Sequence, residues 1–146
     1  MAYSWLYNVY STEAHTMKSV TIPIINHEYK VVVCWGNLAQ LRKELLDHYY
    51  NPDHVTKSFL KEQTDGRRGV TFREYRCYSV IWIDASLPIS ECLGTLSHEA
   101  VHAVDYTFQA IEEQDYASSE FFAHSVGAVV RETIKAMRLL SPKAKK

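Results

Sequence analysis

The stretch His98-Glu99-Ala100-Val101-His102 dominates this chain, because it matches the pattern H-E-x-x-H. Residues four apart in an α-helix lie one above the other on the same face, so both imidazoles can bind one ion from a single helix. Glu99 follows His98 directly, where its carboxylate can act as general base toward a metal-bound water. The motif therefore predicts one Zn²⁺ per chain, with His98 and His102 as ligands and Glu99 as the catalytic residue.

The residues around the motif have the pattern of an amphipathic helix. Pro88 lies near its expected start, where a missing N–H is tolerated. We predict a helix over about 88–111, mostly buried, and a buried imidazole needs a partner that a metal would supply. Apolar side chains recur at spacings of three and four residues, at Leu93, Leu96, Ala100, Val101, Val104 and Phe108.

A catalytic zinc site needs a third protein ligand and an open position for water. Glu120 opens a second apolar-periodic segment, which predicts a C-terminal helix over about 116–140, packed antiparallel to the first. That packing would carry Glu120 back toward the histidines, which makes it the predicted third ligand. His124 lies one turn further on the same face, and three roles stay open for it: support of Glu120, contact with substrate, or replacement of Glu120 as ligand.

Further side chains are candidates for supporting roles. Asp105 follows His102 by three residues and is placed to accept a hydrogen bond from its ring N–H. Hydrolysis of a peptide bond also needs a donor to the developing oxyanion. The candidate donors, among which the sequence does not choose, are Tyr106, Tyr116, His124 and His54.

With these residues the chain resembles the small zincin-type metallopeptidases of bacteriophages and prophages, which have gluzincin-like ligands. The resemblance rests on the stretches 80–84, 96–106 and 119–124 and on the apolar helix that continues to Leu140. It implies that a glutamate opening the last helix is the third ligand, which maps onto Glu120. The family usually has an aromatic residue where this chain has His124. The resemblance covers the C-terminal half well and the N-terminal half only by strand pattern, and it implies no particular substrate.

The remaining elements predict an α+β, zincin-like fold, with a small mixed sheet packed on the active-site helix and the C-terminal helix. Pro23 indicates that the first strand lies at an edge. The resemblance to zincins also implies that the strand before the active-site helix, here Val80, Ile81, Trp82 and Ile83, lies at the sheet edge, where unpaired backbone groups can bind an extended peptide. The expected elements are a hairpin of strands 20–25 and 29–35, helices 37–50 and 54–63, and strands 70–75 and 78–84.

Length and composition predict a single domain over 1–146, with 1–17 as an extended arm and 141–146 as a frayed tail. The formal net charge is −1, so no basic field argues for nucleic-acid binding. The two arginines of the turn at 64–69 are interpreted as solvated charge. The three cysteines, Cys34, Cys77 and Cys92, form no Cys-x-x-Cys pair, and we expect them to be core residues in a reducing compartment.

The N-terminus lacks the pattern of a signal peptide and no stretch predicts a membrane span, so we expect a cytoplasmic protein, in the host cell if phage-encoded. The predicted function is zinc-dependent hydrolysis of a peptide or protein substrate. The alternative is a non-catalytic, zinc-stabilised phage accessory, assembly or partner-binding protein. A fourth protein ligand would favour that alternative, whereas a water in the fourth position would favour catalysis. The oligomeric state is not indicated.

Overall fold

The fold is taken from a computed structural model, which describes residues 9–10, 18–24, 29–36, 38–48, 55–73, 78–111 and 119–140. Its elements follow the predicted order, with one short strand added at the start. They are β1 (Val9–Tyr10), β2 (Lys18–Ile24), β3 (Tyr29–Trp35), α1 (Leu38–His48), α2 (Lys57–Thr64), β4 (Gly69–Arg73), β5 (Tyr78–Ile83), α3 (Ile89–Ile111) and α4 (Ser119–Leu140).

The strands form one mixed sheet in the order β1-β2-β3-β5-β4. β2 and β3 pair antiparallel along their whole length, which confirms the expected pairing of these two strands. β3 and β5 run parallel, and β4 returns antiparallel to β5. The protein therefore has a mixed α+β fold, built on a five-stranded sheet whose first member has two residues.

The structure corrects the expectation that Val80–Ile83 lies at a sheet edge. β5 has a hydrogen-bonded neighbour on each side, β3 and β4, so its backbone groups are used within the sheet. The edge is β4, Gly69–Arg73. β2 is covered by β1 at Ser19 and Val20, so it is not an edge strand throughout, although Pro23 pairs only with Lys30 of β3.

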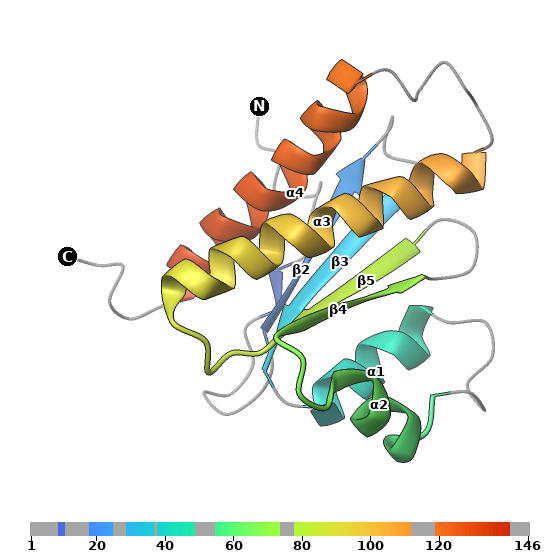
Figure 1. The fold of residues 1–146 in the computed structure, drawn as a ribbon, viewed down its shortest axis with the longest axis vertical. Coiled ribbons are helices and arrows are strands. Elements are labelled where there is room, and N and C mark those ends of the chain that lie inside the picture. Colours follow the sequence, from blue (N-terminus) through green and yellow to red (C-terminus); the bar gives the residue numbers. More distant parts are fainter. Residues whose placement is uncertain are drawn as a thin grey trace.

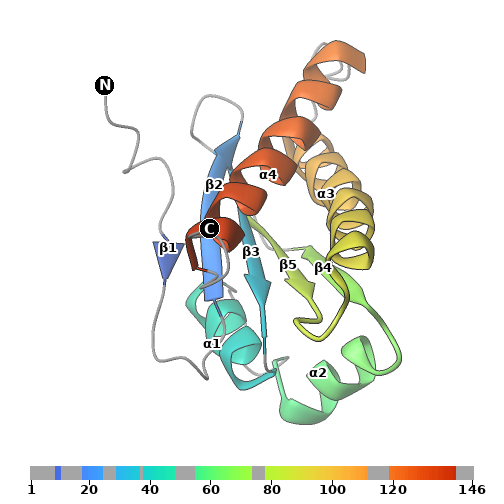
Figure 2. The same cartoon turned by 90° about the vertical axis from the view of Figure 1, so that its left-hand side faces the viewer.

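Helices cover both faces of the sheet (Figure 1). On one face, α3 contacts β4 and β5, and α4 contacts α3 and β2 (Figure 2). This side holds the larger core cluster, to which the sheet contributes Val31, Val33, Ile81 and Ile83. On the other face, α1 and α2 bury Leu41, Leu45 and Leu60 against the alternate side chains of the strands. The alternation follows from the two-residue period of a strand.

The helix that carries the motif, α3, begins within one residue of its predicted start. The side chains of Leu96, Ala100 and Val104 are fully buried, so most of the predicted apolar stripe faces the sheet. Val101, which was predicted in the same stripe, is 44% exposed and does not. Cys34 and Cys92 are buried, as expected of core cysteines, and Cys77 lies outside the described residues. Most of the expected arm, the tail and residues 112–118 before α4 also lie outside them. No described helix is both long and apolar enough to cross a bilayer.

Candidate metal centre and its pocket

The two histidines of the motif face each other on α3. The His98 Nε2 and His102 Nε2 atoms are 3.2 Å apart, and the rings meet edge to face with centroids 4.8 Å apart. Two nitrogen ligands bound at 2.0–2.1 Å to a tetrahedral zinc would be separated by about 3.3 Å. The pair therefore fits the separation required of two ligands to one zinc ion.

Both imidazoles are exposed, which corrects the expectation that they are buried in a mostly buried helix. The helix buries the face that carries Ala100, Ala103 and Val104, and the histidines lie on its exposed side. Because the imidazoles are exposed, burial is no longer an argument that they need a metal ion as a partner. Their exposure leaves the ring nitrogens accessible from outside the protein.

The candidate base Glu99, in contrast, is buried, with only 8% of its surface exposed. It points toward β4, the edge strand, where the Thr71 Oγ1 atom lies 2.5 Å from its Oε2 and 3.0 Å from its own carbonyl oxygen. The Thr71 hydroxyl donates its single hydrogen within this pair of contacts. Thr71 therefore ties the edge strand to the backbone and to the side chain of the candidate base.

Gly69 permits this close approach of strand and helix. A Cβ atom at Gly69 would lie 2.6 Å from Thr95 Cγ2, 3.0 Å from the Trp82 carbonyl oxygen and 3.3 Å from Glu99 Cγ. Any side chain at this position would push β4 and α3 apart. The glycine is thus required by packing at the point where the strand meets the motif helix.

The free edge of β4 runs beside Glu99. The amide of Asp84 donates to the carbonyl of Arg68 over 2.9 Å, and these residues stand one step before the pair Gly69↔Ile83. Bonded and non-bonded pairs alternate along an antiparallel ladder. The N–H and C=O groups of Gly69 and Thr71 therefore point away from β5, and no described strand pairs with them.

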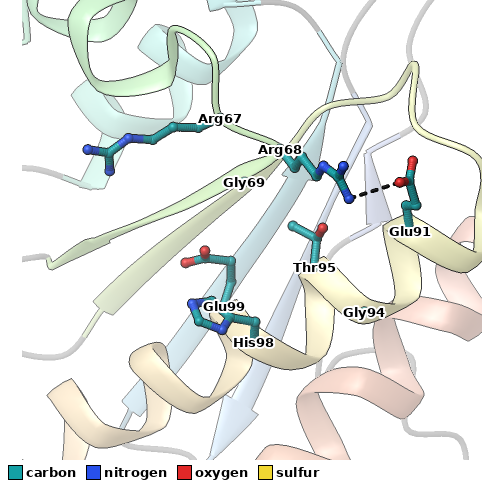
Figure 3. Close-up of a pocket in the computed structure, with 8 residues that line it drawn as sticks. All are labelled: Arg67, Arg68, Gly69, Glu91, Gly94, Thr95, His98 and Glu99. Atoms are coloured by element: carbon teal, nitrogen blue, oxygen red, sulfur yellow. Dashed lines mark ion pairs between the residues drawn. The ribbon is translucent and has the colours of Figure 1, made fainter.

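A pocket of about 450 Å³ opens next to the motif (Figure 3). Arg68 reaches across its mouth to Glu91 on the first turn of α3, at 2.9 Å, whereas Arg67 extends to the other side. The pocket is lined by Arg67, Arg68, Gly69, Glu91, Gly94, Thr95, His98 and Glu99. It links the candidate base and one candidate ligand to the start of the edge strand.

The predicted third ligand is not brought to the histidines. Glu120 and His124 lie one turn apart on α4, with Oε2 and Nε2 3.5 Å apart and side chains 89% and 83% exposed. α4 contacts α3 through Phe108, which packs on Phe121 and Phe122 of α4. Among the described residues no three His, Cys, Asp or Glu form a group that could hold a metal. The assignment of Glu120 stays a prediction from the sequence.

The other predicted positions have mixed placements. Asp105 accepts a hydrogen bond from Gln109 at 2.8 Å, and no bond joins it to His102 within the described ranges. Tyr106 stacks on the His102 ring with centroids 6.3 Å apart, so it packs beside the candidate ligand. Tyr116 and His54 lie outside the described residues.

Sequence reasoning missed Thr71 and Gly69 and left the arginines as solvated charge. A glycine at the start of a strand can indicate that another segment approaches the backbone closely, so the sequence contained a signal for the role of Gly69. The sequence contained no such signal for Thr71, because its contact with Glu99 depends on the packing of segments that are distant in the sequence. Arg67 and Arg68 are exposed as expected, and they also line the pocket.

Comparison of the chain with protein-family models, curated proteins and solved structures gives no match. The family resemblance therefore rests on the motif residues and their spacing.

Proposed function

We propose that this protein is a zinc-dependent, zincin-like metallopeptidase of the gluzincin type. The observation that carries the proposal is the 3.2 Å separation of the His98 and His102 Nε2 atoms, with Glu99 beside them on the same helix. These residues would supply two ligands and a base. The third ligand is proposed from the sequence as Glu120, with His124 as the substitute.

The chain's own groups account for the proton transfers of peptide hydrolysis. Bound Zn²⁺ would supply Lewis acidity, lowering the pKa of a water to near 7 and polarising the scissile carbonyl. The Glu99 carboxylate would take the proton released as the water oxygen bonds to the carbonyl carbon. It would then pass that proton to the nitrogen that leaves as the C–N bond breaks. The Thr71 hydroxyl would hold the carboxylate in place for both transfers.

The edge strand supports a peptide as the substrate. The free N–H and C=O groups of Gly69 and Thr71 can add an extended chain as a further strand. Because Thr71 also contacts Glu99, a backbone bound there would run past the base. The open pocket beside Glu99 favours catalysis over a structural metal, which would need no space for a ligand.

The metal is tested by measuring the zinc content of purified protein by mass spectrometry. We expect about one zinc per chain in the wild type, and loss of zinc in His98→Ala and His102→Ala. Glu99→Gln should keep the zinc, as should the control Glu132→Gln, which alters a carboxylate of α4 that pairs with Arg131 and Lys135. Full zinc occupancy in both histidine variants would refute the assigned ligands.

The chemistry is tested on a mixture of peptides from denatured proteins, with new termini identified by mass spectrometry. The wild type and Glu132→Gln should cleave, and Glu99→Gln should lose at least about a hundredfold in rate. Equal cleavage by Glu99→Gln would refute the assigned base. Zinc binding with no cleavage by any form would instead favour the non-catalytic zinc protein.

A further inference from the structure

The candidate metal donors come in two exposed pairs on different helices. His98 and His102 lie one turn apart on α3, with ring nitrogens 3.2 Å apart. Glu120 and His124 lie one turn apart on α4, with their nearest side-chain atoms 3.5 Å apart. A catalytic zinc site needs three protein ligands, so the α3 pair lacks one. The α4 pair carries the kind of donor that the α3 pair still needs.

Within one chain, the packing of the two helices keeps the pairs apart. Phe108 on α3 contacts Phe121 and Phe122 on α4 and belongs to the buried core. The contact places the first turn of α4 beside a residue six positions after His102, which corresponds to about 9 Å of helix rise. That turn therefore lies toward the C-terminal end of α3, beyond the middle turns that carry the motif (Figure 1).

The direction of the side chains widens this separation. Side chains of an α-helix lean toward the N-terminus of their own helix. Because α4 runs back along α3, the histidines lean toward the start of α3 while Glu120 leans away from them, toward the start of α4 (Figure 1). Bringing Glu120 to the histidines of its own chain would require α4 to slide along α3 and would break the contacts of Phe108.

A second copy of the chain can supply the third ligand without disturbing this packing. The histidines are exposed, and the Glu120 and His124 side chains are 89% and 83% exposed, so another molecule can reach both pairs. Val101, between the histidines, is 44% exposed, and a protein docked here would bury this apolar side chain. In a two-fold dimer the same surfaces of both copies meet, which would create two equivalent sites.

We propose that the metal centre is shared between two copies of this chain. His98 and His102 of one copy bind the zinc ion, and the Glu120–His124 pair of the other copy supplies the third ligand. The inference rests on the proposed zinc site and adds where its third ligand comes from. The dimer holds two zinc ions, so the ratio of one zinc per chain is unchanged.

The test mixes two double variants, each of which lacks one pair. His98→Ala with His102→Ala keeps the α4 pair, and Glu120→Ala with His124→Ala keeps the α3 pair. Zinc content is measured against a competing chelator, so that only tight sites are counted. Neither variant alone should hold zinc. An equimolar mixture should hold up to about one zinc per two chains, because one site of each mixed dimer is complete. Mixing cannot restore a site that is built within one chain.

Sedimentation velocity measures the association directly. In the wild type, zinc should lower the dissociation constant of the dimer at least about tenfold relative to protein in chelator. Zinc should also dimerise the mixture, but neither double variant alone. The control is Arg131→Ala with Glu132→Ala, which removes another pair from α4 and should respond to zinc as the wild type does. The substituted side chains lie outside the buried core, and circular dichroism confirms that each variant folds.

Tight zinc binding by a monomeric wild type overturns the shared site, as does a mixture that binds no more zinc than its components. If that monomer also cleaves peptides in a Glu99-dependent way, the proposed function holds without the shared site. If the mixture regains zinc and dimerises but the wild type cleaves no peptide, the shared site holds and the peptidase is refuted.

Discussion

The Thr71 hydroxyl oxygen lies 2.5 Å from the Glu99 carboxylate and 3.0 Å from the Glu99 carbonyl oxygen. One side chain on the edge strand thus contacts both the backbone and the side-chain carboxylate of Glu99, the candidate base. The strand whose free edge would bind a peptide is therefore also the strand that orients the carboxylate of the candidate base. If the proposed function holds, a single residue would place the substrate backbone relative to the base.

Replacing Thr71 should separate orientation of the base from substrate binding. Thr71→Val removes the hydroxyl donor and should lower kcat about tenfold or more, with little change in KM, because the backbone edge remains. The free energy of unfolding should fall by about 1–3 kcal/mol, because a buried acceptor loses its donor. Steady-state kinetics on a cleaved peptide and urea unfolding give both quantities.

The control is Thr71→Ser, which keeps the hydroxyl and should retain most of the activity. A Thr71→Val variant with wild-type kcat would show that the hydrogen bond does not orient Glu99 during turnover. Equal losses in the Val and Ser variants would show that the hydroxyl, which Ser keeps, is not the cause, and would assign the effect to altered packing at this position.

A second prediction concerns the contact of strand and helix at Gly69. Gly69→Ala places a Cβ 2.6 Å from Thr95 Cγ2 and should destabilise the protein by about 1–3 kcal/mol. Thr95→Ser removes that methyl group, so the double variant should recover part of the loss. Urea unfolding of the four forms makes a double-mutant cycle. If the two changes in unfolding free energy simply add, the Thr95 methyl group is not the contact that requires glycine at position 69.

Much of the fold follows from local patterns in the sequence. The apolar spacing of three and four residues located α3, and Pro88 located its start to within one residue. The β-branched runs located β2 and β3, because such side chains fit a pleated, half-buried surface. These features depend on residues close in sequence, so a single chain can reveal them.

Strand order could not be obtained in the same way, since it depends on pairing between distant segments. Val80–Ile83 was predicted at the edge, yet a continuous apolar run is typical of a strand covered on both faces. The structure places it between β3 and β4. The partner of Glu99 was missed for the same reason, because Thr71 and Glu99 are 28 residues apart.

A third prediction uses Cys34, on the sheet face that α1 covers. Burial, and then the nearby Glu44 carboxylate, raise the pKa of this thiol well above 9.0. The unfolded chain loses this proton near pH 9 and the folded chain keeps it, so the folded state binds more protons above that pH. The free energy of unfolding should then fall by up to about 1.4 kcal/mol per pH unit until the folded thiol also ionises.

Urea unfolding from neutral to alkaline pH tests this, with Cys34→Ala as the reference. The variant is less stable at neutral pH, because the substitution leaves a cavity, but it lacks this titration. The stability advantage of the wild type should shrink as the pH rises above 9. Burial also raises the pKa of Cys92, but this thiol is present in both proteins and cancels in the difference. A constant advantage across the series would contradict the raised pKa of Cys34.

The last prediction concerns the third ligand, which the sequence assigns to Glu120. The Glu120 and His124 side chains are exposed and, among the described residues, pair only with each other, at 3.5 Å. Metal ligation by Glu120 would tie the first turn of α4 to α3. Zinc should therefore slow amide hydrogen exchange in that turn of the wild-type protein, but not in the same turn of Glu120→Ala.

Zinc affinity should fall at least about a hundredfold in Glu120→Ala, and Glu132→Ala on the same helix should bind zinc normally. Loss confined to His124→Ala would make His124 the ligand in its place. Normal zinc affinity in a double variant that combines Glu120→Ala with His124→Ala would show that neither residue holds the metal.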